Sequence, residues 1–118
     1  MDRIRQLPTY DDLPVGIGLR EARGFRARLL GLAFLHRLDA DDALLIPRCR
    51  SVHTFGLRFP IDVVFVDADW HVLRVVRDLR PRRIASCRGA AAVIEVKAGE
   101  ADRLRAGLSL WRARAAGS

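Results

Sequence analysis

The sequence feature that most constrains the fold is a succession of short apolar runs, each bounded by Gly, Pro or Asp. They lie at Ala43–Ile46, Ser51–Phe55, Ile61–Val66, Val72–Val76 and Ala92–Val96. Runs this short that are rich in Val, Ile and Phe are typical of strands rather than helices. Closely spaced short strands favour a barrel or a sandwich. The sequence therefore predicts a mainly β fold, a compact antiparallel β-barrel or sandwich with one or two short helices.

Weaker signals flank these runs. Apolar residues alternate with glycine over Val15–Leu19, which predicts a strand, and an apolar stripe over 25–32 predicts a short helix. We also expect a helical turn at Glu100–Arg105, closed by Gly107, and a last strand at Leu108–Ala113. The predicted core consists of Leu29, Leu32, Leu44, Ile46, Val52, Phe59, Val63, Val64, Phe65, Val66, Leu73, Val75, Val93, Ile94 and Val96.

Length and composition narrow the class of protein. With 118 residues, 50% apolar and 30% charged, the chain is long enough for one core and too apolar for a disordered segment. Its apolar runs are far shorter than the roughly 20 residues that span a membrane, and no secretory signal is visible. We expect a soluble, cytoplasmic protein without membrane insertion. Its expected organisation is a polar leader over 1–14, a single β domain over 15–114 and a tail over 115–118.

The stretch from Arg48 to Asp67, RCRSVHTFGLRFPIDVVFVD, carries the most specific pattern. It resembles the signature of the domain of unknown function 192 (DUF192) family, Ser-Ile-His-Thr-Phe-Phe-Met-Arg-Phe-Pro-Ile-Asp-Val-Val-Phe-Leu-Asp. Residues 28–32 resemble the family's entry helix, and residues 92–99 its late strand. The resemblance implies a mainly β, barrel-like domain and no assigned reaction. Trp70 departs from the family pattern by replacing a turn glycine, so that the turn needs either another geometry or a non-glycine residue at positive φ.

Within this stretch, a hairpin with its loop at Leu57–Pro60 would place His53 and Asp62 on one face of adjacent strands. The candidate pocket residues are His53, Thr54, Arg58 and Asp62. Two interpretations stay open. Asp62 could orient His53 as a general base, although Ser51 lacks the Gly-x-Ser-x-Gly elbow of a nucleophile. Alternatively, His53 is a half-buried structural residue and Asp62 accepts backbone N–H groups of the preceding loop.

The cysteines give no support to a metal site. Cys49 and His53 lie about 13 Å apart along a straight strand at roughly 3.3 Å per residue, too far to share one ion. Together with Cys87 they fall short of a structural zinc set. Cys49 and Cys87 are predicted to be small buried hydrophobes rather than a disulfide. No metal and no cofactor is predicted.

The chain is basic, with a net charge of +7, and 20 of its 21 basic residues are arginines because Lys97 is the one lysine. The densest group of arginines surrounds Pro81 and consists of Arg77, Arg80, Arg82, Arg83 and Arg88. Such a loop either binds phosphates or is a solvated loop of an arginine-rich protein. Phe55, Phe59 and Phe65 follow core-type patterns, which leaves Tyr10, Trp111 and an exposed Trp70 as surface aromatics.

Three functions remain open after these observations. The first is a small, non-catalytic binding or accessory module with a protein partner or small ligand near His53, Arg58 and Asp62. The second is a weak, non-specific nucleic-acid or polyanion binder that uses the arginine loop. The third is a small hydrolase-type enzyme, which needs a nucleophile or metal within about 3 Å of His53.

Overall fold

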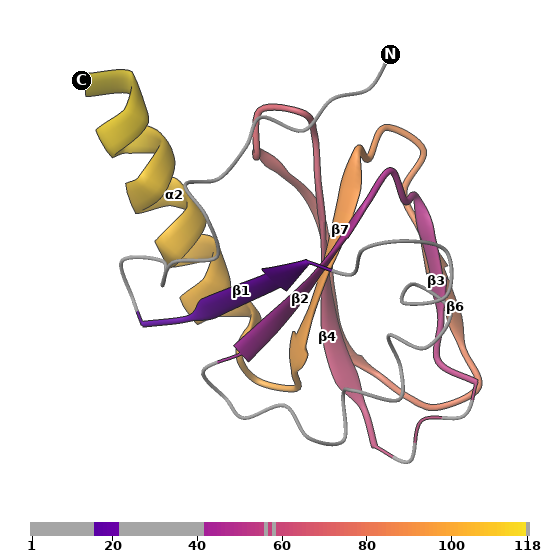
Figure 1. Ribbon diagram of the computed structural model, residues 1–118. Coiled ribbons are helices and arrows are strands. Elements are labelled where there is room, and N and C mark those ends of the chain that lie inside the picture. The colour runs from indigo at the N-terminus through magenta and orange to yellow at the C-terminus, as the bar shows by residue number, and fades with distance from the viewer. Residues whose placement is uncertain (1–15, 22–41, 56, 58, 118) are drawn as a thin grey trace.

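The centre of the molecule is a five-stranded sheet in the order β1-β2-β7-β4-β5 (Figure 1). The computed structural model describes residues 16–21, 42–55, 57 and 59–117. β1 pairs parallel with β2, and the other neighbouring strands of the sheet are antiparallel. The strands are β1 (Gly18–Glu21), β2 (Asp42–Pro47), β4 (Ile61–Val66), β5 (Val72–Leu79) and β7 (Ala92–Lys97).

One face of the sheet is covered by the helix α2 (Ala101–Gly117). Leu104 and Leu108 of α2 are fully buried in one hydrophobic cluster with Val64 and Val66 of β4. Residues four apart lie on the same face of a helix, so this spacing suits packing on a sheet. The helix therefore closes one side of the core.

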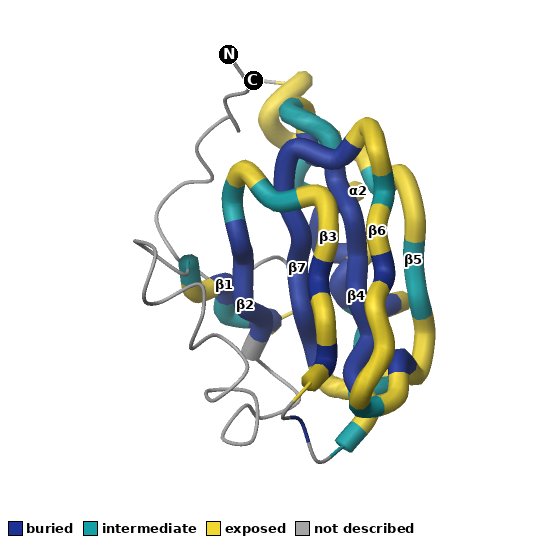
Figure 2. The backbone as a smooth tube through the Cα atoms, turned by 90° about the vertical axis from the view of Figure 1, so that its right-hand side faces the viewer, coloured by how far each residue is buried: buried dark blue, intermediate teal, exposed yellow. Residues whose placement is uncertain are grey.

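The other face is covered by a two-stranded ribbon, in which β3 (Ser51–His53) pairs antiparallel with β6 (Ile84–Ser86). In each strand the middle residue is buried and the two flanking residues are exposed, as strand alternation requires. The buried residues, Val52 and Ala85, belong to a second cluster with Phe65 of β4. Figure 2 shows the ribbon in front of β7 and β4, so that helix, sheet and ribbon form three layers.

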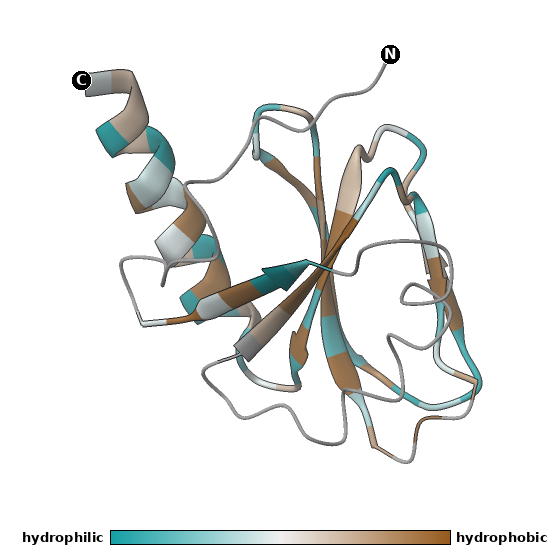
Figure 3. Ribbon diagram, in the orientation of Figure 1, coloured by the Kyte–Doolittle hydropathy of each residue, from teal (hydrophilic) through white to brown (hydrophobic). Residues whose placement is uncertain are grey.

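The two central strands are almost continuously apolar because layers cover both their faces. Every residue of β4 is buried, and in β7 only Lys97 is exposed. β-branched Val and Ile fit such a central, doubly covered position. In Figure 3 the middle of the sheet is largely hydrophobic, whereas the loop from β5 to β6 is hydrophilic.

The predicted mainly β fold is confirmed. The strands expected at 43–46, 61–66, 72–76 and 92–96 correspond to β2, β4, β5 and β7. The sheet is open, with β1 and β5 as its edges, so the sandwich-like alternative is correct and the closed barrel is not. Leu73 was placed in the core, which is wrong, because it lies on the edge strand β5 and is exposed.

The predicted hairpin between the His53 strand and the Asp62 strand is wrong. β3 pairs with β6, and β4 pairs with β5 and β7. A six-residue strand buried on both faces needs long partners along both edges to satisfy its backbone, and a three-residue strand cannot supply one. His53 and Asp62 consequently belong to different sheets.

The predicted end of the chain is also wrong, because α2 continues through Gly107 to Gly117 instead of giving way to a strand. Ala101, Leu104 and Leu108 are buried at helical spacing, and Trp111 packs against the same cluster. Packing of this stripe on the sheet outweighs the helix-breaking tendency of a single glycine, which costs about 1 kcal/mol. The one helix described here is therefore long rather than short.

The turn between β4 and β5 buries a tryptophan. Trp70 has φ 69°, as one of the two sequence-based alternatives predicts, but its side chain is 1% exposed, so the expected exposed tip is wrong. Its ring meets Trp111 edge-on with centroids 6.2 Å apart, and Arg112 of α2 donates to the Trp70 carbonyl at 2.7 Å. The ring contact and this hydrogen bond thus hold α2 against the tip of the β4–β5 hairpin.

The predicted leader over 1–14, the predicted helix over 25–32 with core residues Leu29 and Leu32, and the candidate Arg58 lie outside the described residues.

Candidate functional site

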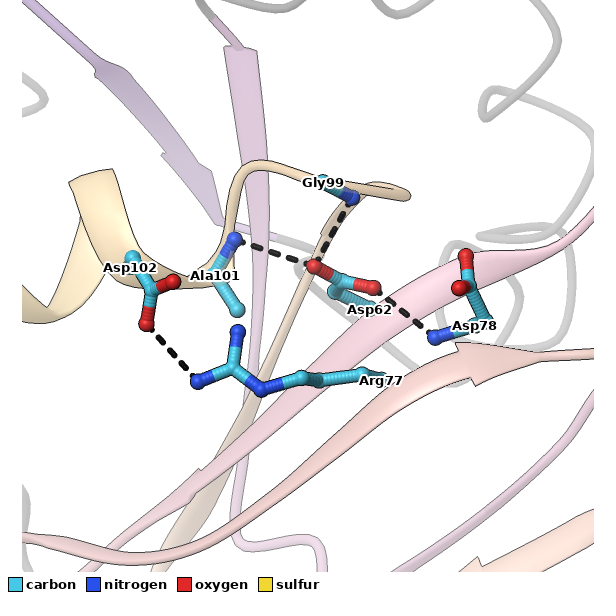
Figure 4. A network of polar contacts seen from close by, with 6 residues as sticks. All are labelled: Asp62, Arg77, Asp78, Gly99, Ala101 and Asp102. Carbon is cyan, nitrogen blue, oxygen red and sulfur yellow. Dashed lines mark hydrogen bonds and ion pairs between the residues drawn. The ribbon is translucent and has the colours of Figure 1, made fainter.

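Asp62 is a buried carboxylate that joins three elements. Its side chain is 1% exposed. Oδ1 accepts the N–H of Asp78 at 2.9 Å, and Oδ2 accepts those of Gly99 and Ala101 at 2.9 and 3.0 Å (Figure 4). Ala101 begins α2, where backbone N–H groups lack helical acceptors and attract negative charge. Asp62 accepts backbone N–H groups, as one interpretation expects, but the donors lie in β5 and the approach to α2, not in the preceding loop.

Arg77 lies on the helix side of the sheet. Its Nη2 is 2.7 Å from Oδ1 of Asp102 on α2, and both side chains are well exposed. The hydrogen bond and the charge of Asp102 raise the pKa of the Arg77 guanidinium above its ordinary value. Arg77 is therefore separated from the other arginines of the predicted patch.

Thr54 holds the arginine loop against the end of β3. Its buried hydroxyl donates to the carbonyl of Arg80 at 2.5 Å and accepts the N–H of Arg83 at 2.8 Å. Its backbone N–H donates to the carbonyl of Arg83, and its carbonyl accepts the N–H of Arg82. Arg82 has φ 63°, an uncommon conformation for a non-glycine residue that these bonds hold in place. Thr54, a candidate pocket residue, is therefore part of the same loop structure as Arg80, Arg82 and Arg83 of the candidate basic patch.

The outer face of the ribbon, turned away from the sheet, carries exposed rings and an exposed aliphatic side chain. His53 and Phe55 both project from it, with ring centroids 5.6 Å apart and planes tilted by 51°. Phe55 is 51% exposed, and Ile84, which pairs with His53 across the ribbon, is 66% exposed. The interpretation of Phe55 as a core residue is therefore wrong. We call this outer face, together with the exposed Arg50, Arg80, Arg82, Arg83 and Arg88, the ribbon surface.

The arginines lie at both ends of the ribbon. Arg80, Arg82 and Arg83 are held at one end by Thr54. At the other end the carbonyl of Arg50 accepts the N–H of Cys87, the residue before Arg88. Neither 48–55 nor 80–91 contains an Asp or Glu. The ribbon surface is therefore strongly positive, which favours an anionic partner.

Glu95 is a second buried carboxyl, on the central strand β7. Its register neighbours are Leu44 of β2 and Val63 of β4, both in the cluster beneath the ribbon. It is 1% exposed, and its Oε2 has no hydrogen-bond partner in the described structure. Burial raises the pKa of Glu95 to about 7. A neutral carboxylic acid in this apolar layer avoids most of the cost of burying a charge.

Of the four candidate pocket residues, Arg58 lies outside the described residues, and the other three do not form one site. His53 and Thr54 belong to the ribbon side, whereas Asp62 faces α2 on the opposite side of the sheet. Cys49 and Cys87 are free, partly buried cysteines. Among the described residues, no group of three or more His, Cys, Asp or Glu side chains is placed to hold a metal ion.

Sequence reasoning missed Phe55, Ile84 and Glu95. The alternation Ser51-Val52-His53-Thr54-Phe55 contains the signal for Phe55, since residues i and i+2 share a strand face. The interpretation of His53 as half-buried is wrong, because His53 is exposed on the same face as Phe55. Glu95 was visible as a single carboxylate inside the apolar run from Ala90 to Val96. Ile84 had no signal, because its strand is only three residues long.

In the part of the chain that the structure describes, no helix combines the length and apolar character needed to cross a membrane. A family model named DUF192 and described as "Uncharacterized ACR" matches residues 11–109. No curated protein shows significant sequence similarity to the chain.

Two solved structures share the fold. One is a protein of unknown function from Novosphingobium aromaticivorans DSM 12444, with 23% identity and a TM-score of 0.64 over 75% of this chain and 68% of that chain. The other, from Sinorhizobium meliloti 1021, is described as "a putative transcription regulator", with 23% identity and a TM-score of 0.64 over 75% of this chain and 74% of that chain. Identity this low shows a common fold alone.

Proposed function

The chain belongs to the DUF192 family, and from this premise we propose that it is a small, non-catalytic binding module whose ribbon surface binds an anionic partner. The family description names no reaction, and the chain's own residues support the proposal. The observation that carries the proposal is the acid-free surface of the ribbon, where exposed arginines lie at both ends and His53, Phe55 and Ile84 are exposed at the end nearer Arg82 and Arg83.

The arrangement of the ribbon surface favours binding over catalysis. His53 contacts the ring of Phe55, and within the described residues it has no hydrogen bond to a carboxylate or a hydroxyl that would make it a general base. The bonds from Thr54 fix the backbone of the arginine loop before any ligand arrives. A preformed loop lowers the conformational entropy that binding must remove. An anion is the ligand class that these arginines fit, because guanidinium groups donate paired hydrogen bonds to phosphate and carboxylate oxygens.

The test compares two double variants that remove equal charge. Arg82→Gln/Arg83→Gln changes the ribbon surface, and Arg105→Gln/Arg114→Gln changes exposed positions of α2 on the other side of the sheet. The probe is inorganic polyphosphate, titrated by calorimetry at low salt. We expect the ribbon double variant to bind about tenfold more weakly and the helix double variant to bind within about twofold of the wild type, because close phosphate contacts dominate affinity.

Equal losses in the two double variants would mean that net charge, not the ribbon, attracts the anion, and the proposal would be wrong. Absence of measurable polyphosphate binding to the wild type would also overturn it. Circular dichroism of both variants checks that the fold is retained, which is expected because all four side chains are exposed.

A further inference from the structure

The ribbon surface combines two kinds of group that a purely charged site does not need together. His53 is the last residue of β3, and Phe55 lies two residues further along the chain; their rings are 5.6 Å apart and both residues are exposed to solvent. Arginines lie at both ends of the ribbon. A partner that matches this surface presents negative charges along its length and flat apolar groups between them.

We infer that the ribbon surface binds single-stranded nucleic acid, with bases stacked on Phe55 and His53 and backbone phosphates against the arginines at the two ends of the ribbon. This inference rests on the proposed function and names its ligand. Base stacking on exposed aromatic side chains of a strand, within a positive surface, is how sequence-tolerant single-strand binders work. Because every base has a π-face, such a site needs no reading helix.

The alternatives fit fewer of these observations. An acidic peptide would bind the arginines but leaves the paired rings without a role. A duplex keeps its bases stacked inside, where rings on a flat ribbon do not reach them. The single strand is the anion that engages both groups at once.

The spacing of the groups is compatible with a short stretch of nucleic acid. Arg83 and Arg88 flank β6, and the five residue steps from one to the other span at most roughly 16 Å at about 3.3 Å per residue. Thr54 holds the backbone of the loop at the Arg83 end, so this separation exists before binding. His53 pairs with Ile84, the residue after Arg83, and Phe55 follows Thr54, whose backbone is bonded to Arg82 and Arg83. The two rings therefore lie at the Arg80–Arg83 end of the ribbon, where a strand stacked on them brings its phosphates close to these arginines and continues along the ribbon toward Arg88.

The experiment separates stacking from charge with two matched truncations. Phe55→Ala removes the ring from the ribbon, and Leu110→Ala removes a similarly exposed apolar side chain from α2. Four probes are titrated by calorimetry: single-stranded oligodeoxythymidine, the same strand annealed to oligodeoxyadenosine, inorganic polyphosphate and polyglutamate. Phe55→Ala is expected to weaken binding of the single strand about tenfold, as loss of one stacked base does, and to leave polyphosphate binding unchanged.

Two control variants and the salt dependence of binding give further expected results. Phe55→Tyr keeps a ring and should bind the single strand within about twofold of the wild type, and Leu110→Ala should do the same. The single strand should bind more tightly than the duplex. Its affinity should fall steeply as the salt concentration rises, and this salt dependence should be smaller in Arg82→Gln/Arg83→Gln.

The inference is overturned, with the proposed function intact, if Phe55→Ala binds the single strand as well as Leu110→Ala does while the ribbon arginine variant still loses affinity. It is likewise overturned if polyglutamate or the duplex binds the ribbon more tightly than the single strand. If none of the four polyanions binds the wild type, the proposed function and this inference fall together.

Discussion

Two buried carboxyl groups, Asp62 on β4 and Glu95 on β7, occupy neighbouring positions in the same sheet but face opposite sides of it. The surroundings of Asp62 are polar, and those of Glu95 are apolar. Asp62 pairs with Val96, and Glu95 pairs with Val63, so the two are one register step apart. Each is 1% exposed. Asp62 points toward α2 and accepts three backbone N–H groups, whereas Glu95 points toward the ribbon layer among apolar neighbours.

Burial alone does not determine the protonation state of a carboxyl group. Hydrogen bonds from backbone N–H groups and the start of a helix stabilise a charged carboxylate. Glu95 has no such donors among the described residues at Oε2, and desolvation raises its pKa to about 7. Asp62 therefore stabilises the fold by accepting backbone hydrogen bonds, whereas burial favours the neutral form of Glu95 by raising its pKa to about 7.

The largest expected effect comes from removing the bonded member of the pair. Asp62→Ala leaves the N–H groups of Asp78, Gly99 and Ala101 without their acceptor, and each buried unsatisfied donor costs about 1–3 kcal/mol. We expect the free energy of unfolding to fall by at least about 4 kcal/mol, measured by urea denaturation followed by circular dichroism.

Asp62→Asn is the companion variant in case the alanine variant does not fold. It keeps one acceptor oxygen and should lose less stability than Asp62→Ala, still with a clear loss relative to the wild type. A loss below about 1 kcal/mol in both variants would show that α2 does not depend on this carboxylate.

The next largest effect is a gain in stability, expected for a substitution of Glu95. In the folded protein Glu95 has a pKa raised from 4.5 to about 7, so between these values the folded state holds a proton that the unfolded state has released. Stability from this group is therefore greatest below the unfolded pKa, declines as pH rises toward 7, and is level above it. We expect Glu95→Gln to be more stable than the wild type by about 3 kcal/mol near pH 8, from a shift of about 2.5 units.

Near pH 5 the same variant should differ from the wild type by no more than about 1 kcal/mol, since both side chains are then neutral. Urea denaturation of both proteins from pH 5 to pH 8 measures the two expected differences in stability. A variant that is less stable than the wild type at every pH would mean that Glu95 has a favourable partner, and the contrast with Asp62 would fail.

The smallest effect belongs to the exposed ion pair beside Asp62. Arg77→Gln removes the contact with Asp102 on α2 and leaves all three N–H bonds of Asp62 in place. We expect only a small decrease in the urea midpoint, one that disappears at high salt, because exposed ion pairs are screened. A loss comparable to that of Asp62→Ala would show instead that the surface pair holds the start of α2.

The part of the fold that follows from local pattern was predictable. β-branched runs such as Ile61–Val66 identify central strands whatever their partners are. The pairing of strands was not predictable, because it depends on contacts between residues far apart in the sequence, such as Ser51 with Ser86. Assuming that neighbouring runs form a hairpin put His53 beside Asp62, and the length of the buried strand overrode that assumption.

The candidate sites show the same limit. Thr54 and the arginines around Pro81 were each identified from sequence, but as parts of two sites. Only the antiparallel pairing of β3 with β6 brings the Thr54 hydroxyl to the backbone of Arg80 and Arg83. Glu95 carried a local signal, yet the lack of a hydrogen-bond partner for its Oε2 among the described residues depends on the packing of three strands and was not predictable from one.

The contact between Trp70 and Trp111 makes the fluorescence of the protein sensitive to the position of α2. The chain has two tryptophans, and both lie where α2 meets the β4–β5 hairpin, in edge-to-face contact. The ribbon strands contain none. Intrinsic fluorescence should therefore shift to longer wavelength when α2 separates from the sheet and keep its emission maximum when a ligand occupies the ribbon. A single emission scan thus distinguishes loosening of the helix layer from events on the opposite face.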